Sequence, residues 1–230
     1  MMDTGQTVSP KVVAFHSVIA AVGIMYVLVA AVIVHFLQPD LPLLSSPISQ
    51  YAVGPYGVLF AIALLVWGIA SLILAIGLYR NVCPSRPLRV GIFLLVVFGT
   101  GLIIASIFPM DVPFPPKNFF PESFTAIGLT HILSATISSV CFPFSALFLS
   151  MSFQKDERWK LFQPLAHIVA LSTLGALASF FIISGVDIRF FGIGQKIFAA
   201  LVLLWLLLTT VRLFEYRKFP HNRGACVALD

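Results

Sequence analysis

The sequence is poor in charged residues, which make up 10% of its 230 residues, whereas hydrophobic residues make up 59%. A soluble globular domain usually has about 25% charged residues, so this composition argues against one. The chain also lacks a long polar segment that would supply a separate soluble domain. We therefore expect a single membrane domain over residues 1–230.

The sequence also has few of the residue patterns that hold metals and cofactors. It contains three cysteines and five histidines, but neither a Cys-x-x-Cys nor a His-x-x-x-His spacing occurs. Without such a spacing, no single helix or turn presents two ligands to one metal ion. We expect no metal site and no cofactor.

What the sequence has instead is six long apolar stretches. They cover about residues 12–37, 56–79, 88–108, 124–153, 161–184 and 190–214. Each is long enough to cross a hydrocarbon core of about 30 Å at about 1.5 Å per residue. Backbone polar groups inside a membrane must be paired within their own segment, so these stretches are predicted to be helices. The predicted fold is an all-α bundle of six transmembrane helices.

The basic residues predict how this bundle sits in the membrane. Most of the 14 Lys and Arg residues fall in the termini and in every second loop. These residues are Lys11, Arg80, Arg86, Arg89, Lys155, Arg158, Lys160, Arg212, Arg217, Lys218 and Arg223. By the positive-inside rule, both termini are predicted to be cytoplasmic and the protein to span the inner (plasma) membrane. Basic residues beside membrane segments serve topology and lipid contact, so we expect no nucleic-acid partner.

Two further expectations concern the predicted cytoplasmic side. The polar run at residues 154–160 reads as a solvated turn between two helices. Cys83 and Cys226 are assigned to this reducing side and Cys141 to the membrane interior. No cysteine pair is therefore expected to form a disulfide.

Small residues four positions apart indicate where helices approach closely. Gly101 with Ala105 and Gly175 with Ser179 each have this spacing, which puts two small side chains on one helix face. Such faces let two helix backbones come together in a membrane. We expect close packing at both pairs.

The two long loops on the predicted outer side differ from the cytoplasmic ones. They cover residues 38–55 and 109–123 and together hold nine prolines among many apolar residues. Proline fixes φ and removes a backbone donor, so such loops are stiff. We predict that they form two lids over the outer end of the bundle.

Two ionisable residues lie at membrane depth near that outer end. His131 is about two turns into the fourth stretch, and Lys196 is about two turns into the sixth. A charged side chain at the centre of a membrane helix costs about 2.5–3.5 kcal/mol on the insertion scale, so each residue needs a reason. Ser134 and Ser138 follow His131 at i+3 and i+7 and are predicted to share its face. We expect these groups to line a polar pocket beneath the lids.

This pocket is expected to bind a lipid headgroup or a small amphipathic molecule. Lys196 would hold an anionic group, and His131 would donate a hydrogen bond or carry a proton, with Asp111 setting its charge. The candidate ligand-binding residues are His131, Lys196, Asp111, Ser134, Ser138, Ser49, Tyr51 and Arg189, with His35, Asp40, Lys117, Asp187 and Gln195 as further partners at the same level.

Structural roles for these residues stay open beside the functional one. Lys196 could snorkel to the membrane interface, and His131 could form a hydrogen bond between two helices. Asp111 could be a turn residue or a helix cap. Two other functions also stay open. A lipid-modifying hydrolase or transferase would need a nucleophile or metal beside the histidine, and a carrier would need a path across the membrane.

Three segments carry a resemblance to a known family. They are residues 49–57 (Ser-Gln-Tyr-Ala-Val-Gly-Pro-Tyr-Gly), residues 108–111 (Phe-Pro-Met-Asp) and His131. Together they resemble the bacterial membrane family catalogued as domain of unknown function 998, and more remotely the six-helix proteins of the Frag1 and DRAM type. The resemblance implies the six-helix fold and the place of the pocket. Where the family has a glycine and an acidic-basic pair, this chain has Gly194, Gln195 and Lys196.

Overall fold

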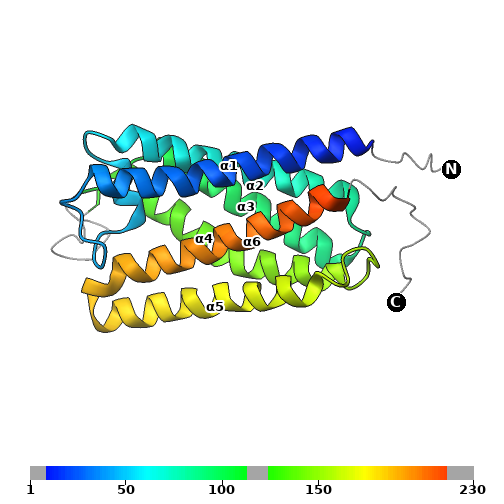
Figure 1. Ribbon diagram of the computed structural model, residues 1–230. Coiled ribbons are helices and arrows are strands. Elements are labelled where there is room, and N and C mark those ends of the chain that lie inside the picture. The colour runs from blue at the N-terminus through cyan, green and yellow to red at the C-terminus, as the bar shows by residue number, and fades with distance from the viewer. Residues whose placement is uncertain (1–8, 113–123, 217–230) are drawn as a thin grey trace.

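The computed structural model of the chain describes residues 9–112 and 124–216, and these contain six long helices (Figure 1). The helices are α1 (Pro10–Leu37), α2 (Gly57–Asn81), α3 (Arg86–Ile107), α4 (Ala126–Phe153), α5 (Gln163–Val186) and α6 (Phe191–Tyr216). All six are long and apolar enough to cross a membrane, and no strand occurs in the described residues. The predicted fold class is confirmed: the chain is an all-α, multi-pass membrane protein.

The helices form a closed ring. Each helix packs on the next one in the chain, and α1 also packs on α6 (Figure 1). Phe142 of α4 lies inside the ring, with its ring centroid 4.8 Å from that of Phe98 on α3 and 5.9 Å from that of Trp205 on α6. Large apolar side chains on the outside of every helix are exposed, as a lipid-facing surface requires. We call the end where α1 begins and α6 ends the basic end, and the opposite end the cavity end.

Glycines mark the points where neighbouring helices approach most closely. A Cβ atom at Gly68 of α2 would collide with the backbone of Gly99 on α3, and one at Gly101 would collide with the Ser138 hydroxyl of α4. Close packing at Gly101 is therefore confirmed. The same prediction is wrong for Gly175, because no described atom lies within 4 Å of the place where its Cβ would be.

The basic end is closed by buried polar groups. Asp156, in the loop between α4 and α5, is 1% exposed and forms an ion pair of 2.9 Å with Arg158. Its Oδ2 atom also accepts a hydrogen bond of 3.3 Å from the backbone N–H of Cys83, and Arg212 of α6 donates to the Arg158 carbonyl. The prediction of a solvated turn in this loop is wrong, because both Asp156 and Trp159 are buried.

The cysteines also differ from expectation. Cys83 is bonded in a disulfide, whereas Cys141 is a free thiol inside α4. The prediction that no cysteine is positioned for a disulfide is therefore wrong. Cys226 lies outside the described residues.

Candidate functional site

The loop between α1 and α2, residues 38–56, is held over the cavity end by the first turns of α6. Lys196 Nζ donates to the carbonyl of Leu43 at 3.0 Å and to that of Ser46 at 2.6 Å. A Cβ atom at Gly192 would collide with the backbone of Ser46, so only glycine lets α6 come this close to the loop. We call these residues 38–56 the first loop.

Tyr51 ties the first loop to α1 and α2. It lies in the short 3-10 helix η1 (Ile48–Ala52), where it is buried, and its hydroxyl is 2.7 Å from Nδ1 of His35. Gln38 donates to the Tyr51 carbonyl at 3.3 Å, and the Tyr51 ring packs edge-on against Phe60 of α2. Burial raises the pKa of the Tyr51 phenol, so this residue acts as a neutral anchor.

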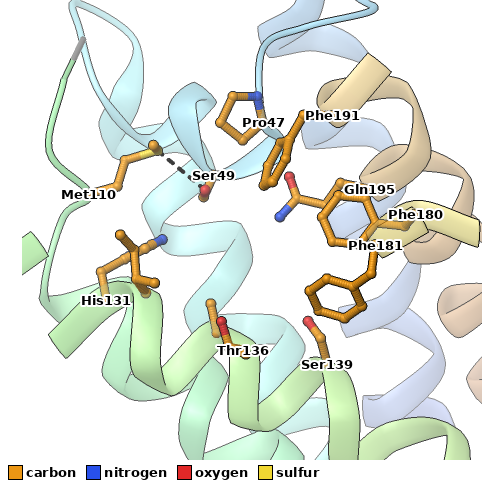
Figure 2. A pocket seen from close by; sticks show the side chains of 12 residues that line it. Pro47, Ser49, Met110, His131, Thr136, Ser139, Phe180, Phe181, Phe191 and Gln195 are labelled. Atoms are coloured by element: carbon orange, nitrogen blue, oxygen red, sulfur yellow. Dashed lines mark hydrogen bonds between the residues drawn. The ribbon is translucent and has the colours of Figure 1, made fainter. Parts of the chain in front are cut away.

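A cavity of about 170 Å³ lies beneath the first loop, between α4, α5 and the start of α6 (Figure 2). A smaller compartment of about 60 Å³ adjoins it and reaches Trp67 and Phe98 at the centre of the bundle. The residues that line both compartments are Ser49, His131, Ala135, Ser139 and Gln195. The polar side chains therefore gather where the two compartments meet.

His131 is the buried polar residue of this cavity. It is 3% exposed, and its Nδ1 atom lies 2.8 Å from the carbonyl of Phe108 and 3.0 Å from that of Ala105. Because carbonyls only accept, Nδ1 must carry a proton, and Nε2 of the neutral ring is then an acceptor. This Nε2 is buried and has no hydrogen-bond partner among the described residues. Figure 2 shows a ring nitrogen of His131 directed toward the open space of the cavity.

Ser49 and Gln195 place two further polar groups at the cavity. The Ser49 hydroxyl donates to Sδ of Met110 at 3.3 Å, and a thioether sulfur is a weak acceptor. Oε1 of Gln195 accepts from the Ile48 N–H at 2.7 Å, which fixes the orientation of the amide. Its Nε2 then points into the cavity (Figure 2). Gln195 is therefore a donor held in place by the backbone of the first loop.

Aromatic rings form the opposite wall. Phe180 of α5 lies 4.8 Å from Phe191 of α6 and 5.0 Å from Phe181, measured between ring centroids. Phe181 lines the cavity and yet is 49% exposed, and Thr136 across from it on α4 is also exposed. The cavity thus reaches the outside of the bundle between α4 and α5 (Figure 2).

Comparison with known proteins places the chain in a family. The model of a protein family of unknown function, DUF998, matches residues 19–212. The chain belongs to this family. The match spans parts of all six helices and every residue that lines the cavity. Searches of curated proteins and of solved structures gave no match.

In this DUF998 protein, Ser134 and Ser138 lie on another side of α4 than the cavity. The Ser134 hydroxyl donates to the His131 carbonyl at 2.9 Å, and the Ser138 hydroxyl donates to the Ser134 carbonyl at 2.7 Å. Ser138 packs against Gly101 of α3, and neither serine lines the cavity. The α4 residues that do are His131, Ile132, Ala135, Thr136 and Ser139. Thr136 and Ser139 were not among the predicted site residues.

Asp111 ties the loop after α3 to the start of α4. It accepts hydrogen bonds from the backbone N–H of Thr125 at 2.8 Å and from its hydroxyl at 2.7 Å. The Thr125 hydroxyl in turn accepts from the Gly128 N–H and caps α4. A Cβ atom at Gly128 would collide with the Asp111 carboxylate, so the glycine makes room for this contact. Asp111 is thus not the cap itself but holds the cap residue Thr125 in place, which is a structural role.

Arg189 and Asp187 do not line either compartment of the cavity. Arg189 pairs with Asp187 at 2.7 Å on the surface, where its side chain is 82% exposed. Hydrogen bonds from Arg189 hold the pKa of the Asp187 carboxyl below its usual value. Lys117 and most of the second predicted lid lie outside the described residues. Among those described, no group of three or more His, Cys, Asp and Glu side chains is placed to hold a metal ion.

Proposed function

We propose that this DUF998 protein binds a small amphipathic molecule or a lipid headgroup in the cavity beneath the first loop. The observation that carries the proposal is the Nε2 atom of His131, which is buried, lines the cavity and has no partner among the described residues. Leaving such an atom unsatisfied costs about 1–3 kcal/mol, so native proteins rarely do so. A mostly apolar cavity with a few convergent polar groups is typical of a small-molecule site.

Each polar side chain has a distinct role in this proposal. His131 Nε2 accepts a hydrogen bond from the ligand, Gln195 Nε2 donates one, and the Ser49 hydroxyl turns from Met110 to the ligand. Lys196 already donates to two carbonyls of the first loop. We therefore assign Lys196 to positioning that loop, in place of the anion-holding role expected from the sequence.

We also propose that the protein spans an inner membrane with its basic end in the cytoplasm. The support is the distribution of Lys and Arg residues, which follows the positive-inside rule. The disulfide at Cys83 argues the other way, because cytoplasmic thiols are kept reduced. We give more weight to the basic residues, since they are many and independent. Reporter proteins fused after residue 230 test this orientation. A fluorescent reporter that folds only in the cytoplasm should be active in this fusion. Activity of a periplasmic reporter instead would show that the orientation is the opposite one.

The binding proposal is tested with His131→Asn. The asparagine amide keeps a donor for the Phe108 and Ala105 carbonyls but has no counterpart of Nε2. We expect wild-type protein, extracted from its membrane in mild detergent, to retain an amphipathic molecule that mass spectrometry detects and that the variant has lost. Asp187→Asn, outside the cavity, is the control and should retain it. Equal retention by wild type and His131→Asn would contradict the proposal.

A further inference from the structure

The cavity offers hydrogen-bonding groups without charge. Neither compartment is lined by a Lys, Arg, Asp or Glu residue among those the structure describes. The nearest basic side chain along α6, Lys196, is bonded to loop carbonyls and lies 5.4 Å from the Tyr51 ring centroid. An ionised group that is buried without an opposite charge loses its hydration and gains no ion pair. A phosphate or carboxylate is therefore a poor match for this cavity.

The polar groups match an uncharged hydroxyl. With Nδ1 protonated, His131 offers an acceptor at Nε2, whereas Gln195 offers a donor at its amide nitrogen. A hydroxyl donates one hydrogen bond and accepts another, so a single group satisfies both side chains. A carbonyl oxygen would satisfy Gln195 alone and leave the His131 nitrogen without a partner.

The inner compartment has a second group in need of a partner. Trp67 lines it, and the indole N–H of Trp67 is buried with no acceptor among the described residues. A space of about 60 Å³ has room for a small group, since one water needs only about 10–15 Å³ by the same kind of measure. A second oxygen near the end of the ligand would fill this place and accept from Trp67.

The size of the cavity shows that only the end of a larger ligand fits inside. Its volume of about 170 Å³ is below the range of about 300–1,000 Å³ that is usual for pockets enclosing a whole ligand. The opening between Thr136 and Phe181 is where the rest of the molecule can leave. Thr136 follows the first residue of α4 by ten positions, which is about 15 Å along the helix and at the depth of the acyl chains.

We infer that the cavity binds the uncharged, hydroxyl-bearing end of a single-chain amphiphile, of the monoacylglycerol class, whose chain leaves sideways into the bilayer between α4 and α5. The inference rests on the proposed function and names its ligand class. The polar end meets His131, Gln195 and Trp67, and the aromatic wall of Phe180, Phe181 and Phe191 covers the first part of the chain.

Three ligands with the same chain test the end group. Binding of monooleoylglycerol, oleate and oleoyl lysophosphatidate to the delipidated full-length protein in detergent is measured by native mass spectrometry. We expect monooleoylglycerol to bind at least about tenfold more tightly than either anion, the factor that one unmatched buried group is worth. Equal or tighter binding of an anion would overturn the inference and leave the proposed function standing. Binding of none of the three, and of no molecule retained from the membrane, would overturn both.

A substitution that fills the opening between α4 and α5 tests the path of the ligand's acyl chain. Thr136→Phe places a ring between α4 and α5 and should weaken monooleoylglycerol binding by about tenfold or more, because the chain can no longer leave. Val140→Phe adds the same ring to an exposed position of α4 that does not line the cavity, and should bind as wild type does. Both variants lie on the lipid-facing surface, and their unfolding temperatures check that they fold. Unchanged binding by a folded Thr136→Phe variant would overturn the sideways path.

Discussion

Asp156 at the basic end and His131 at the cavity end are both buried polar residues, but they differ in what surrounds them. At the basic end, the Asp156 carboxylate is paired with Arg158 and accepts from the Cys83 N–H. At the cavity end, His131 is also deeply buried. Its Nε2 atom, however, has no hydrogen-bond partner among the described residues. A buried polar group whose bonds are all made stabilises the fold. An open bond alone does not mark a site, because Thr209, Thr210 and Arg212 near the basic end also have buried side-chain atoms without a partner among the described residues. The difference is that the His131 nitrogen borders a cavity.

The largest expected loss of stability comes from a substitution at the basic end. Asp156→Ala leaves Arg158 without its buried partner, and we expect the free energy of unfolding to fall by about 3 kcal/mol or more. Denaturant titration in detergent micelles measures this change. Glu157→Ala is the matched control, because its ion pair with Lys160 is solvent-exposed and worth about 0–1 kcal/mol. Equal losses for the two variants would remove the contrast between the ends.

A smaller and local effect is expected at the first loop. Lys196→Met removes the donor that holds the Leu43 and Ser46 carbonyls, at an expected cost of about 2 kcal/mol. Amide hydrogen exchange should become faster within residues 43–49 and stay unchanged at the basic end. Arg189→Met serves as control, since this residue does not contact the loop in the described hydrogen bonds and ion pairs. Unchanged exchange in the first loop would show that Lys196 does not position it.

A third comparison separates two faces of α4. Ser138→Ala removes a hydroxyl that bonds to its own helix, so we expect ligand retention to stay as in wild type. Ser139→Val fills part of the passage between the two compartments, and should lower ligand retention severalfold through lost space. Mass spectrometry of the retained molecule measures both variants. If Ser138→Ala has the larger effect, the face assigned to the cavity is wrong.

The smallest effect is expected at the exposed pair of Arg189 and Asp187. Hydrogen bonds from Arg189 lower the pKa of the Asp187 carboxyl, so any stability from the pair is present above the ordinary carboxyl pKa and is lost as pH falls through the lowered value. Because the pair is open to solvent, its contribution is strongly screened. Asp187→Asn should therefore unfold at the wild-type temperature between pH 5 and pH 8, values chosen well above the ordinary aspartate pKa of about 3.9. A clear shift in that range would give the pair an unforeseen structural role.

The fold could be predicted from the sequence because the membrane allows few alternatives. An apolar stretch of more than 20 residues must be a helix there, and the predicted helix ends differ from those in the structure by two residues at most. The prediction for the loop between α4 and α5 was wrong for a physical reason. Its many charged residues indicate a solvated turn, but Asp156 forms an ion pair with Arg158 two positions away, and both Asp156 and Trp159 are buried.

The site was only partly predictable. His131, Ser49 and Gln195 stood out as polar residues at the right depth, and the structure brings them to one cavity. The sequence does not show which side of α4 faces the cavity together with His131. Ser134 and Ser138 follow it at i+3 and i+7, whereas Ala135 and Ser139 follow it at i+4 and i+8, and neighbouring helices cover both sides. The hydrogen-bond partners of Lys196 could not be predicted either. They are backbone carbonyls, which every residue has, so the sequence gives no signal for them.

The contact between α1 and α6 has a consequence for biosynthesis. A ribosome makes α6 last, so α1 must wait in the bilayer with one flank uncovered until the final helix arrives. That helix also brings Gln195, Gly192 and Lys196, which complete the cavity and fasten the loop above it. A nascent chain stalled after five helices would lie in the membrane without the complete cavity, and the arrival of the sixth would both end assembly and form the proposed binding site.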